Sequence, residues 1–310
     1  MNKEAQPEEV FGRLGGSGGV WPTFVPKAHR TAGGVVYFTE PGVLLLSRPT
    51  FNNLSIEAFL EQFPEELQFE QYVDDQSIGT VFREHGAELI KTAGQLCYMS
   101  FGPNRTKNVE AQKYINNILS SGHGSVLEHA QYSLLLWGAG RDFTHELVRH
   151  RAGVAFSQVS QRYVDGKVLR FVERPEYKDD PLLHESFENR IDRTVREYDD
   201  MARRLTARQT SGDAQLTSEK KTEMRKKVNQ AARSLLPNET EAPIVMSGNI
   251  RALRHICEMR AAGAADVPIR NVTTRIFLCM QRIEPTLFAD YKLLEMPDGT
   301  FCVSTDWRKV

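Results

Sequence analysis

Cysteine is scarce in this chain, and several common enzyme signatures are missing. The 310 residues include 4 cysteines (Cys97, Cys257, Cys279 and Cys302), and no two of them form a C-x-x-C pair. A metal or dithiol site built on paired cysteines is therefore not expected. No G-x-G-x-x-G or G-x-x-x-x-G-K-[ST] motif occurs, so neither a Rossmann nor a P-loop nucleotide site is predicted.

Long hydrophobic runs and an excess of one charge are also lacking. No stretch approaches the ~18 apolar residues that a membrane helix needs, and the N-terminal MNKEAQPEEV has no apolar core typical of a signal peptide. The 39 Lys and Arg nearly cancel the 40 Asp and Glu, so anion binding must come from local clusters. We expect a cytoplasmic protein with reduced cysteines, no membrane contact and no nucleic-acid partner.

Hydrophobic periodicity predicts a mixture of helices and strands. Two short β runs are expected over 35–46, a buried strand over 132–137, and a Pro-Asp-Gly hairpin over 291–303. Helices are expected over 53–75, 108–120, 142–150, 185–233 with a break near 210–213, 249–262 and 267–283. Residues 1–20 end in GRLGGSGG and predict a flexible arm.

The densest chemical signal is RHRAGVAFSQVSQRYV, residues 149–164. Its three arginines can each offer a planar fork of donors to phosphate oxygens, and its serines can complete such a site. One hypothesis is therefore a nucleotide phosphate pocket. The other is structural ion pairing with Glu128, Glu146 or Asp165.

Two further clusters flank this segment. His123, Glu128 and His129 match no common metal-ligand spacing, and Ser125 does not stand in a nucleophile elbow. On a helix over 249–260, Asn249 and Arg260 would share one face, while Arg251, Arg254, His255 and Glu258 would share another. The alternative is a surface helix with Arg254 and Glu258 as an i, i+4 pair.

Together these segments resemble the flavin-dependent thymidylate synthase family. The family signature is an Arg-His-Arg triplet followed by Ser, here 149–151 and Ser160 with eight residues between. The blocks Gln161-Arg162-Tyr163, GHGSVLEHA at 122–130, ARSLLP at 232–237 and NIRALRHICEMR at 249–260 follow the family in kind and order. No metal site belongs to this resemblance.

The resemblance implies a fold, an architecture and an assembly. It implies an α/β (α+β) fold of the thymidylate synthase-complementing protein type, a twisted, largely antiparallel central sheet flanked by helices. Residues 86–285 would form the catalytic domain, with an N-terminal extension over 21–85 packed on it and a C-terminal tail over 286–310. A homotetramer with active sites shared between subunits is also implied.

The resemblance further implies the reaction and the residues that serve it. FAD, NADPH and methylenetetrahydrofolate would serve the C5 methylation of dUMP to dTMP, with Arg260 as the catalytic cation that stabilises ionised uracil. FAD would contact Ser125, Arg149, His150, Arg151, Gln158, Asn249, Ile250, Arg251 and His255. The uridylate would contact Glu146, Leu147, Val148, Arg149, Gln158, Val159, Ser160, Gln161, Arg162 and Arg233.

Three departures from the family pattern bear on the substrate. The spacer AGVAFSQV is one residue longer than in many members, Glu146 stands where some carry Gln, and Pro268 interrupts a block that often reads Ala-Gln-x-Glu-Ile-Arg. These changes leave open a UMP methylase of specialised nucleoside biosynthesis. A non-catalytic nucleotide- or RNA-binding protein, with Phe143, Phe156 and Tyr163 stacking on bases, is the alternative from another class.

Overall fold

The largely antiparallel sheet expected from the sequence is confirmed. A computed structural model of the chain describes residues 3–69, 84–102, 110–164, 166–210 and 218–308. Its largest sheet has six strands in the order β2-β3-β6-β7-β10-β8, and every neighbouring pair is antiparallel. These strands are β2 (Gly16–Ser17), β3 (Thr23–Phe24), β6 (Gly42–Ser47), β7 (Gln131–Trp137), β8 (Val154–Gln158) and β10 (Ile244–Asn249).

Strand β7 lies inside this sheet and shows why its sequence forms a strand. Tyr132, Leu134 and Leu136 alternate toward the core and are fully buried, as the period of two requires. On the other face, the hydroxyls of Ser133 and Ser247 lie 2.7 Å apart across the β7–β10 pair. Strand β8 lies at the edge of the sheet, and the sequence reading had not assigned it as a strand.

A second sheet joins the two ends of the chain. Its order is β1 (Lys3–Ala5), β11 (Tyr291–Glu295) and β12 (Phe301–Thr305), and the β11–β12 pair is the hairpin expected near the C-terminus. The expected flexible arm is wrong for the described residues of 1–20. Helix α1 (Pro7–Arg13) buries Val10 and Phe11, and the Phe11 ring packs 4.9 Å from Phe24, so apolar contacts offset the ordering cost of the glycine-rich segment.

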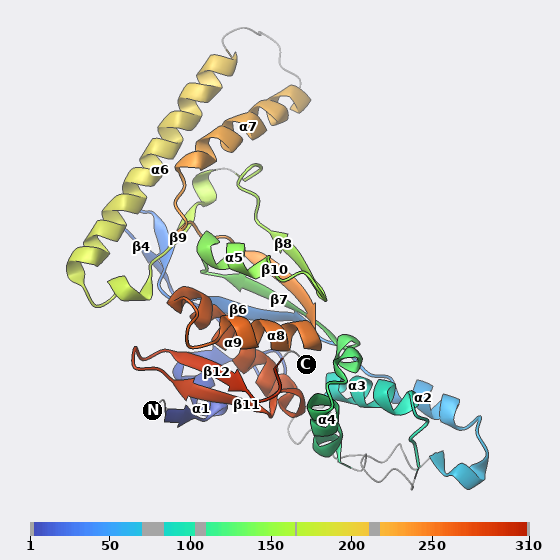
Figure 1. The fold of residues 1–310 in the computed structure, drawn as a ribbon. Helices are drawn as coiled ribbons and strands as arrows, with labels where there is room; N and C mark the ends of the chain where they lie inside the picture. Colours follow the sequence, from blue (N-terminus) through green and yellow to red (C-terminus); the bar gives the residue numbers. More distant parts are fainter. Residues whose placement is uncertain (1–2, 70–83, 103–109, 165, 211–217, 309–310) are drawn as a thin grey trace.

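The helices cover the central sheet and connect it to the C-terminal sheet. Helix α9 (Val267–Ile283), which begins and ends where expected, contacts β6 and β12 and is buried along most of its length (Figure 1). Helix α8 (Ile250–Arg260) follows β10 directly, and α5 (Arg141–Leu147) follows β7. The six-stranded sheet includes β3 and β6, so it crosses the boundary that the sequence placed near residue 85.

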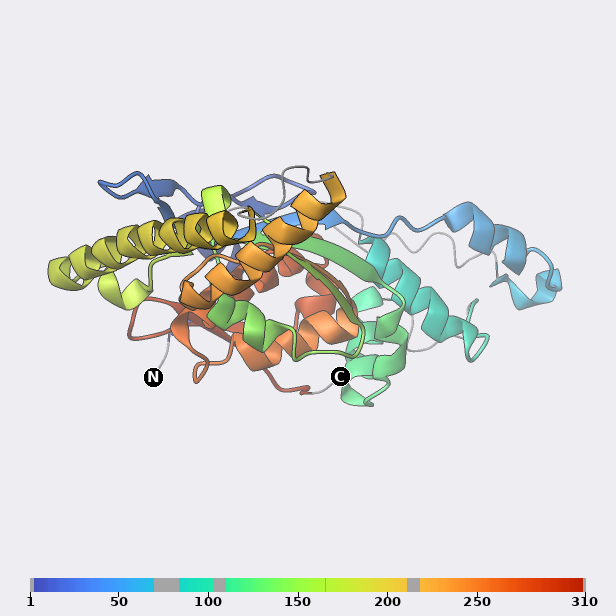
Figure 2. The same cartoon turned by 90° about the horizontal axis from the view of Figure 1, so that it is seen from above.

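Two groups of helices extend from opposite ends of this core (Figures 1 and 2). At one end, α6 (Pro181–Thr210) and α7 (Ser218–Ala232) contact each other in a long hairpin. A small mixed sheet of β4 (Ala28–Arg30), β5 (Val36–Phe38) and β9 (Arg170–Val172) lies near its base. At the other end are α2 (Asn53–Leu60), α3 (His85–Leu96) and α4 (Ala111–Ser120).

A helix that crosses a membrane must be both long and apolar. Among the described residues, no helix combines the length and the hydropathy that crossing a bilayer demands.

Candidate active site

The side chain of Arg260 is held by two of the other residues assigned to the site. Its Nε donates to Nε2 of His150 at 3.0 Å. Its Nη1 lies 2.5 Å from the Glu146 carboxylate, and its Nη2 donates to the Glu146 carbonyl at 3.3 Å. The structure thus brings together residues from α5, the Arg-His-Arg triplet and the end of α8. All three donor nitrogens of the guanidinium have a partner.

This contact fixes the protonation state of His150. The ring accepts a hydrogen bond through Nε2, so the proton of the neutral ring must be on Nδ1. Burial, the Arg260 cation and the neighbouring His255 together lower the pKa of His150 from 6.5 to about 4. The His255 ring meets it edge-on at 5.4 Å, and His255 Nδ1 lies 3.6 Å from the Glu258 carboxylate.

Helix α8 is anchored at its first turn and along its buried face. Asn249 caps it by accepting a 2.8 Å hydrogen bond from the Ala252 amide, which satisfies one of the free amides of the first turn. The alternative of a surface helix is wrong for Arg254. Its side chain is 1% exposed and donates to both carboxylate oxygens of Asp290, at 2.7 and 2.8 Å. Arg254 is therefore a buried residue of α8 whose charge is paired inside the protein.

The end of β8 is connected to α5 by a side-chain hydrogen bond. Gln158 Nε2 donates to Thr144 Oγ1 at 2.8 Å. Thr144 lies two residues before Glu146 and one helical turn before Val148. The chain continues with the Val159 amide donating to the Pro243 carbonyl at 2.9 Å. Ser160 Oγ then accepts from the Arg162 amide at 3.3 Å. Gln158 and Ser160 are thereby positioned relative to α5 and the sheet.

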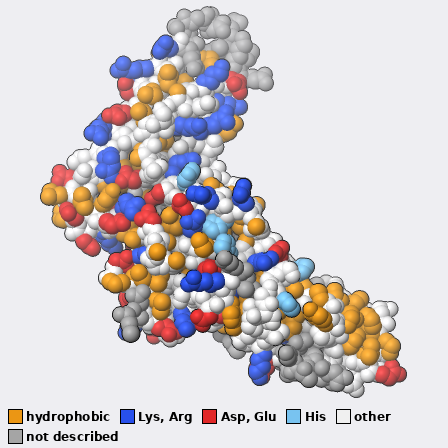
Figure 3. All heavy atoms as spheres, viewed as in Figure 1, with side chains coloured by type: hydrophobic (Ala, Val, Ile, Leu, Met, Phe, Trp, Pro, Cys, Tyr) orange, Lys and Arg blue, Asp and Glu red, His pale blue; other side chains and the backbone are white. Residues whose placement is uncertain are grey.

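Four arginines assigned to ligands are exposed and lack an ion-pair partner in the described part of the chain. They are Arg149, Arg151, Arg162 and Arg233. The carboxylates proposed as structural partners are engaged elsewhere, Glu128 with Arg251 at 2.7 Å and Glu146 with Arg260, while Asp165 lies outside the described residues. Histidine and basic side chains gather on this face over α5 and α8, below the α6–α7 hairpin (Figure 3).

Some of the residues assigned to ligand contacts have buried side chains, so only their backbone could contact a ligand. Leu147 and Ile250 are buried in the main hydrophobic cluster, and the Ile250 amide already donates to the Ala130 carbonyl at 3.0 Å. Val148 and Val159 are partly exposed, at 39% and 38%. Gln161 has a buried Nε2 with no hydrogen-bond acceptor among the described residues.

Two neighbouring hollows meet at Arg251. One, of about 320 Å³, is lined by Gly153, Asn249 and His255, and the other, of about 380 Å³, is lined by Ser125 and Tyr98. Gly153 has φ of +71°, and a Cβ there would lie 2.6 Å from the Asn249 side chain, so only glycine fits this close approach. Tyr98, whose ring is 75% exposed, was not identified from the sequence because no motif surrounds it.

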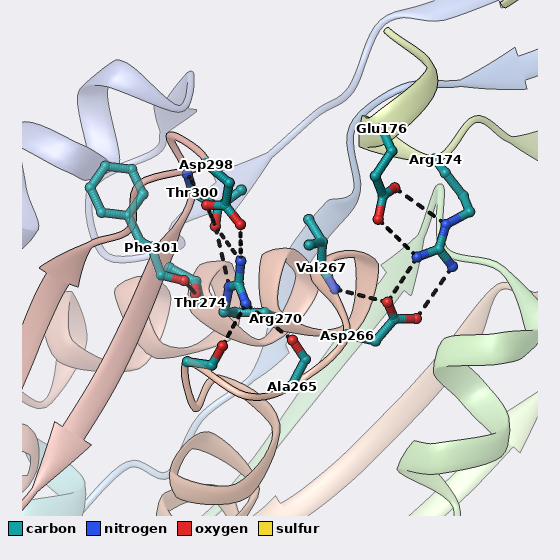
Figure 4. A network of polar contacts seen from close by, with 11 residues as sticks. Arg174, Glu176, Ala265, Asp266, Val267, Arg270, Thr274, Asp298, Thr300 and Phe301 are labelled. Carbon is teal, nitrogen blue, oxygen red and sulfur yellow. Dashed lines mark hydrogen bonds and ion pairs between the residues drawn. The ribbon is translucent and has the colours of Figure 1, made fainter. Parts of the chain in front are cut away.

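A third, larger cavity of about 1110 Å³ opens on the other side of Arg260 and Glu146. Its basic residues Arg141, His145 and Arg308 stand in no motif of the sequence. Its wall over 262–266 is fixed by Arg270, which donates to the Gly263 and Ala265 carbonyls at 2.9 and 3.1 Å and pairs with Asp298 at 2.5 Å (Figure 4). In the same view, Asp266 accepts from Arg174 at 2.8 Å and from the Val267 amide.

Comparison with known proteins identifies the family. The family model described as thymidylate synthase complementing protein matches residues 81–286. The chain belongs to this family. The flavin-dependent thymidylate synthase of Mycolicibacterium gilvum is 39% identical over 69% of this chain and 83% of its own length. That of Mycobacterium tuberculosis (strain CDC 1551) is 37% identical over 71% of this chain and 86% of its own.

These relatives confirm the family resemblance and the expected class of enzyme, a methyltransferase of the flavin-dependent thymidylate synthase type. A crystal structure of the UMP/dUMP methylase PolB from Streptomyces cacaoi bound with 5-Br dUMP also aligns with the chain. Its TM-score is 0.51 at 16% identity, over 81% of this chain and 94% of that one. This likeness supports the fold alone.

Proposed function

We propose that this family member catalyses the reductive methylation of dUMP at C5 to dTMP, using FAD, NADPH and methylenetetrahydrofolate. The observation that carries the proposal is the placement of Arg260 at the edge of a large cavity, held by Glu146 and His150. A fixed cation at this point can stabilise negative charge on a uracil ring, which raises the nucleophilicity of C5.

The donor set around α8 fits FAD. Arg149 and Arg151 are exposed cations without a carboxylate partner among the described residues, as a pyrophosphate group requires. Asn249, Arg251 and His255 line the hollow beside Gly153, and Ser125 lines the next one. Bound there, the flavin would supply the hydride that completes the methyl group. His150 is neutral near pH 7 because its pKa is about 4, so the arginines alone would supply the positive charge of this region.

The nucleotide phosphate would be bound by cations further along the chain. Arg162 and Arg233 are exposed, and Ser160 adds a hydroxyl, so together they offer the donors that a phosphate monoester needs. Gln161 carries a buried Nε2 that lacks an acceptor in the described chain. Arg149 would contact both ligands. We further propose that these residues act across subunits of a homotetramer, with the exposed arginines of one copy completing the site of another.

The buried cysteines near Arg260 are poorly suited to act as the nucleophile. Burial raises the pKa of Cys257 to about 12, and it also raises the pKa of Cys302, which lines the large cavity. A thiol becomes a nucleophile only when its thiolate is accessible near neutral pH. This favours activation of uracil by Arg260 over covalent attack by Cys302, the cysteine that lines the same cavity.

Methylation of UMP is the second candidate, and Glu146 favours it. A carboxylate replaces the amide found in some family members at a position that contacts Arg260 directly. A carboxylate can only accept hydrogen bonds when ionised, so it would suit a substrate with an additional hydroxyl donor. The long spacer of eight residues before Ser160 lies in strand β8 and its entry turn.

A product assay with dUMP and UMP in parallel tests both candidates. Purified enzyme receives FAD, NADPH and methylenetetrahydrofolate, and the methylated nucleotide is measured. We expect turnover of dUMP, and a preference for UMP beyond about tenfold, or ~1.4 kcal/mol, would replace dUMP as the substrate. A colourless preparation that takes up no FAD and forms neither product would favour the non-catalytic binding protein.

A further inference from the structure

The large cavity beside Arg260 is built partly by a segment outside the family match. The family model ends at residue 286, whereas Leu294, residues 302–305 and Arg308 form one wall of the cavity. The amide of Val303 donates to the Ala261 carbonyl at 2.9 Å, so the C-terminal hairpin is joined to the residue that follows Arg260. The hairpin thus forms a continuous surface with the proposed active site.

The carboxylates that line this cavity lie near basic groups, whereas three of its basic residues have no acidic partner in the described chain. Asp142 and Asp266 share one cation, Arg174, at 3.8 and 2.8 Å. Glu146 pairs with Arg260 and Glu258 lies near His255. By contrast, three basic residues that line the cavity have side chains without an ion pair or hydrogen bond to any described residue. They are Arg141, His145 and Arg308.

The unpartnered basic groups lie beside apolar surface. Arg141 and His145 are separated by one helical turn of α5 and share a face. The same cavity is also lined by Ile269 and Val303, which are buried, and by Met259, which is 48% exposed. Such a surface suits a molecule with a flat apolar body and an anionic end.

We propose that this cavity binds the anionic end of a co-substrate, with Arg141, His145 and Arg308 as its charge partners. The proposal rests on the proposed function, which supplies two molecules of this chemistry. One is methylenetetrahydrofolate, whose glutamate tail carries carboxylates, and the other is NADPH, which carries a 2′-phosphate. A volume of about 1110 Å³ accommodates either. The C-terminal hairpin is then a specificity element that lies outside the residues matched by the family model.

Charge reversal at Arg308 tests the proposal. Arg308→Glu and the independent variant Arg141→Glu are compared with Lys292→Glu, an exposed residue of the same hairpin that does not line the cavity. We expect the KM of one co-substrate to rise about tenfold or more, the loss expected when a charged hydrogen-bonding group is removed. The KM of the nucleotide, the FAD content and the Tm should stay as in the wild type.

The identity of the co-substrate follows from which KM moves. A rise for methylenetetrahydrofolate, with loss of any preference for its triglutamate form, assigns the site to the folate tail. A rise for NADPH that NADH does not show assigns it to the 2′-phosphate. No rise in either KM, or an equal rise in Lys292→Glu, overturns the proposal.

Equilibrium dialysis of tetrahydrofolate and NADP⁺ against each variant gives a readout independent of turnover. Weaker binding of one ligand to Arg308→Glu and Arg141→Glu, but not to Lys292→Glu, supports the site even if the wild type forms no methylated nucleotide. That absence of product would contradict the proposed function alone. Unchanged dialysis in an enzyme that makes dTMP would contradict the cavity assignment alone.

Discussion

Arg260 donates a 3.0 Å hydrogen bond from Nε to Nε2 of His150, the central residue of the Arg-His-Arg triplet. This contact orients the guanidinium at the edge of the large cavity. His150 holds Nε, whereas the Glu146 carboxylate holds Nη1. It also connects the residues proposed to contact flavin with the residue proposed to act on uracil.

Replacing Arg260 tests its role in the reaction. Arg260→Ala should retain FAD and lose about 10²- to 10³-fold in kcat, the range seen when one preorganised donor is removed from a charged transition state. Arg260→Lys keeps the charge but lacks the fork, so it should recover only part of the rate. Flavin absorbance and single-turnover product formation are the measurements. Undiminished kcat in Arg260→Ala would remove the residue from its assigned role.

The depressed pKa of His150 predicts a pH dependence of stability. The folded protein holds His150 neutral down to about pH 4, whereas the unfolded chain protonates it near pH 6.5. The unfolded state therefore binds more protons between these values, and the free energy of unfolding should fall as the pH drops from about 6.5 to 4. Urea denaturation across this range should show a shallower fall in His150→Gln. An identical pH profile in that variant would contradict the assigned shift.

The ion pair between Glu146 and Arg260 predicts an effect on nucleotide affinity. Glu146→Gln removes a negative charge beside the proposed site of an anionic substrate, so the KM for dUMP, which lacks the additional hydroxyl, should fall. A partly exposed pair is worth ~0.4–1 kcal/mol, or roughly two- to fivefold. Steady-state kinetics with dUMP and UMP measure this. Glu128→Gln, which breaks the pair with Arg251 instead, is the control and should leave the nucleotide KM unchanged.

The buried pair of Arg254 and Asp290 predicts a large loss of stability. Asp290→Ala leaves the guanidinium, which is 1% exposed, without its carboxylate, and breaking such a pair costs about 3–5 kcal/mol. Denaturant titration gives the free energy of unfolding. Glu110→Ala breaks the exposed pair with Lys113 and should cost less than ~1 kcal/mol. Similar losses in both variants would show that burial of Arg254 does not matter.

Elements with local signals were predictable from the sequence. Helix α9 was placed correctly because Asp266 caps its first turn, Pro268 suits that turn and Pro285 excludes continuation. Strand β7 was predicted because its apolar run is buried in the centre of the sheet. The family motifs identified Glu146, His150 and Arg260 by their order in the chain, and the structure places these three in contact.

Features that depend on distant residues were not predictable. Arg254 looked like a surface residue from its local sequence, whereas its side chain is buried and pairs with Asp290, 36 residues further on. Nothing near Arg141 or Arg308 indicated that they line one cavity, since the β11–β12 hairpin brings the second to the first. The N-terminal residues looked unstructured by composition, but their strand pairs with β11 at the other end of the chain.

The capping of α8 at Asn249 and its attachment to the C-terminal hairpin beyond Arg260 have a mechanical consequence. Arg251 and Arg260 are nine residues apart on one regular helix, which spaces them about 14 Å along its axis. The helix therefore fixes the distance between a residue proposed to contact flavin and the residue proposed to act on uracil. Inserting or deleting one residue within it would turn Arg260 by about 100° relative to Arg251, so its length should tolerate no change even where its surface residues do.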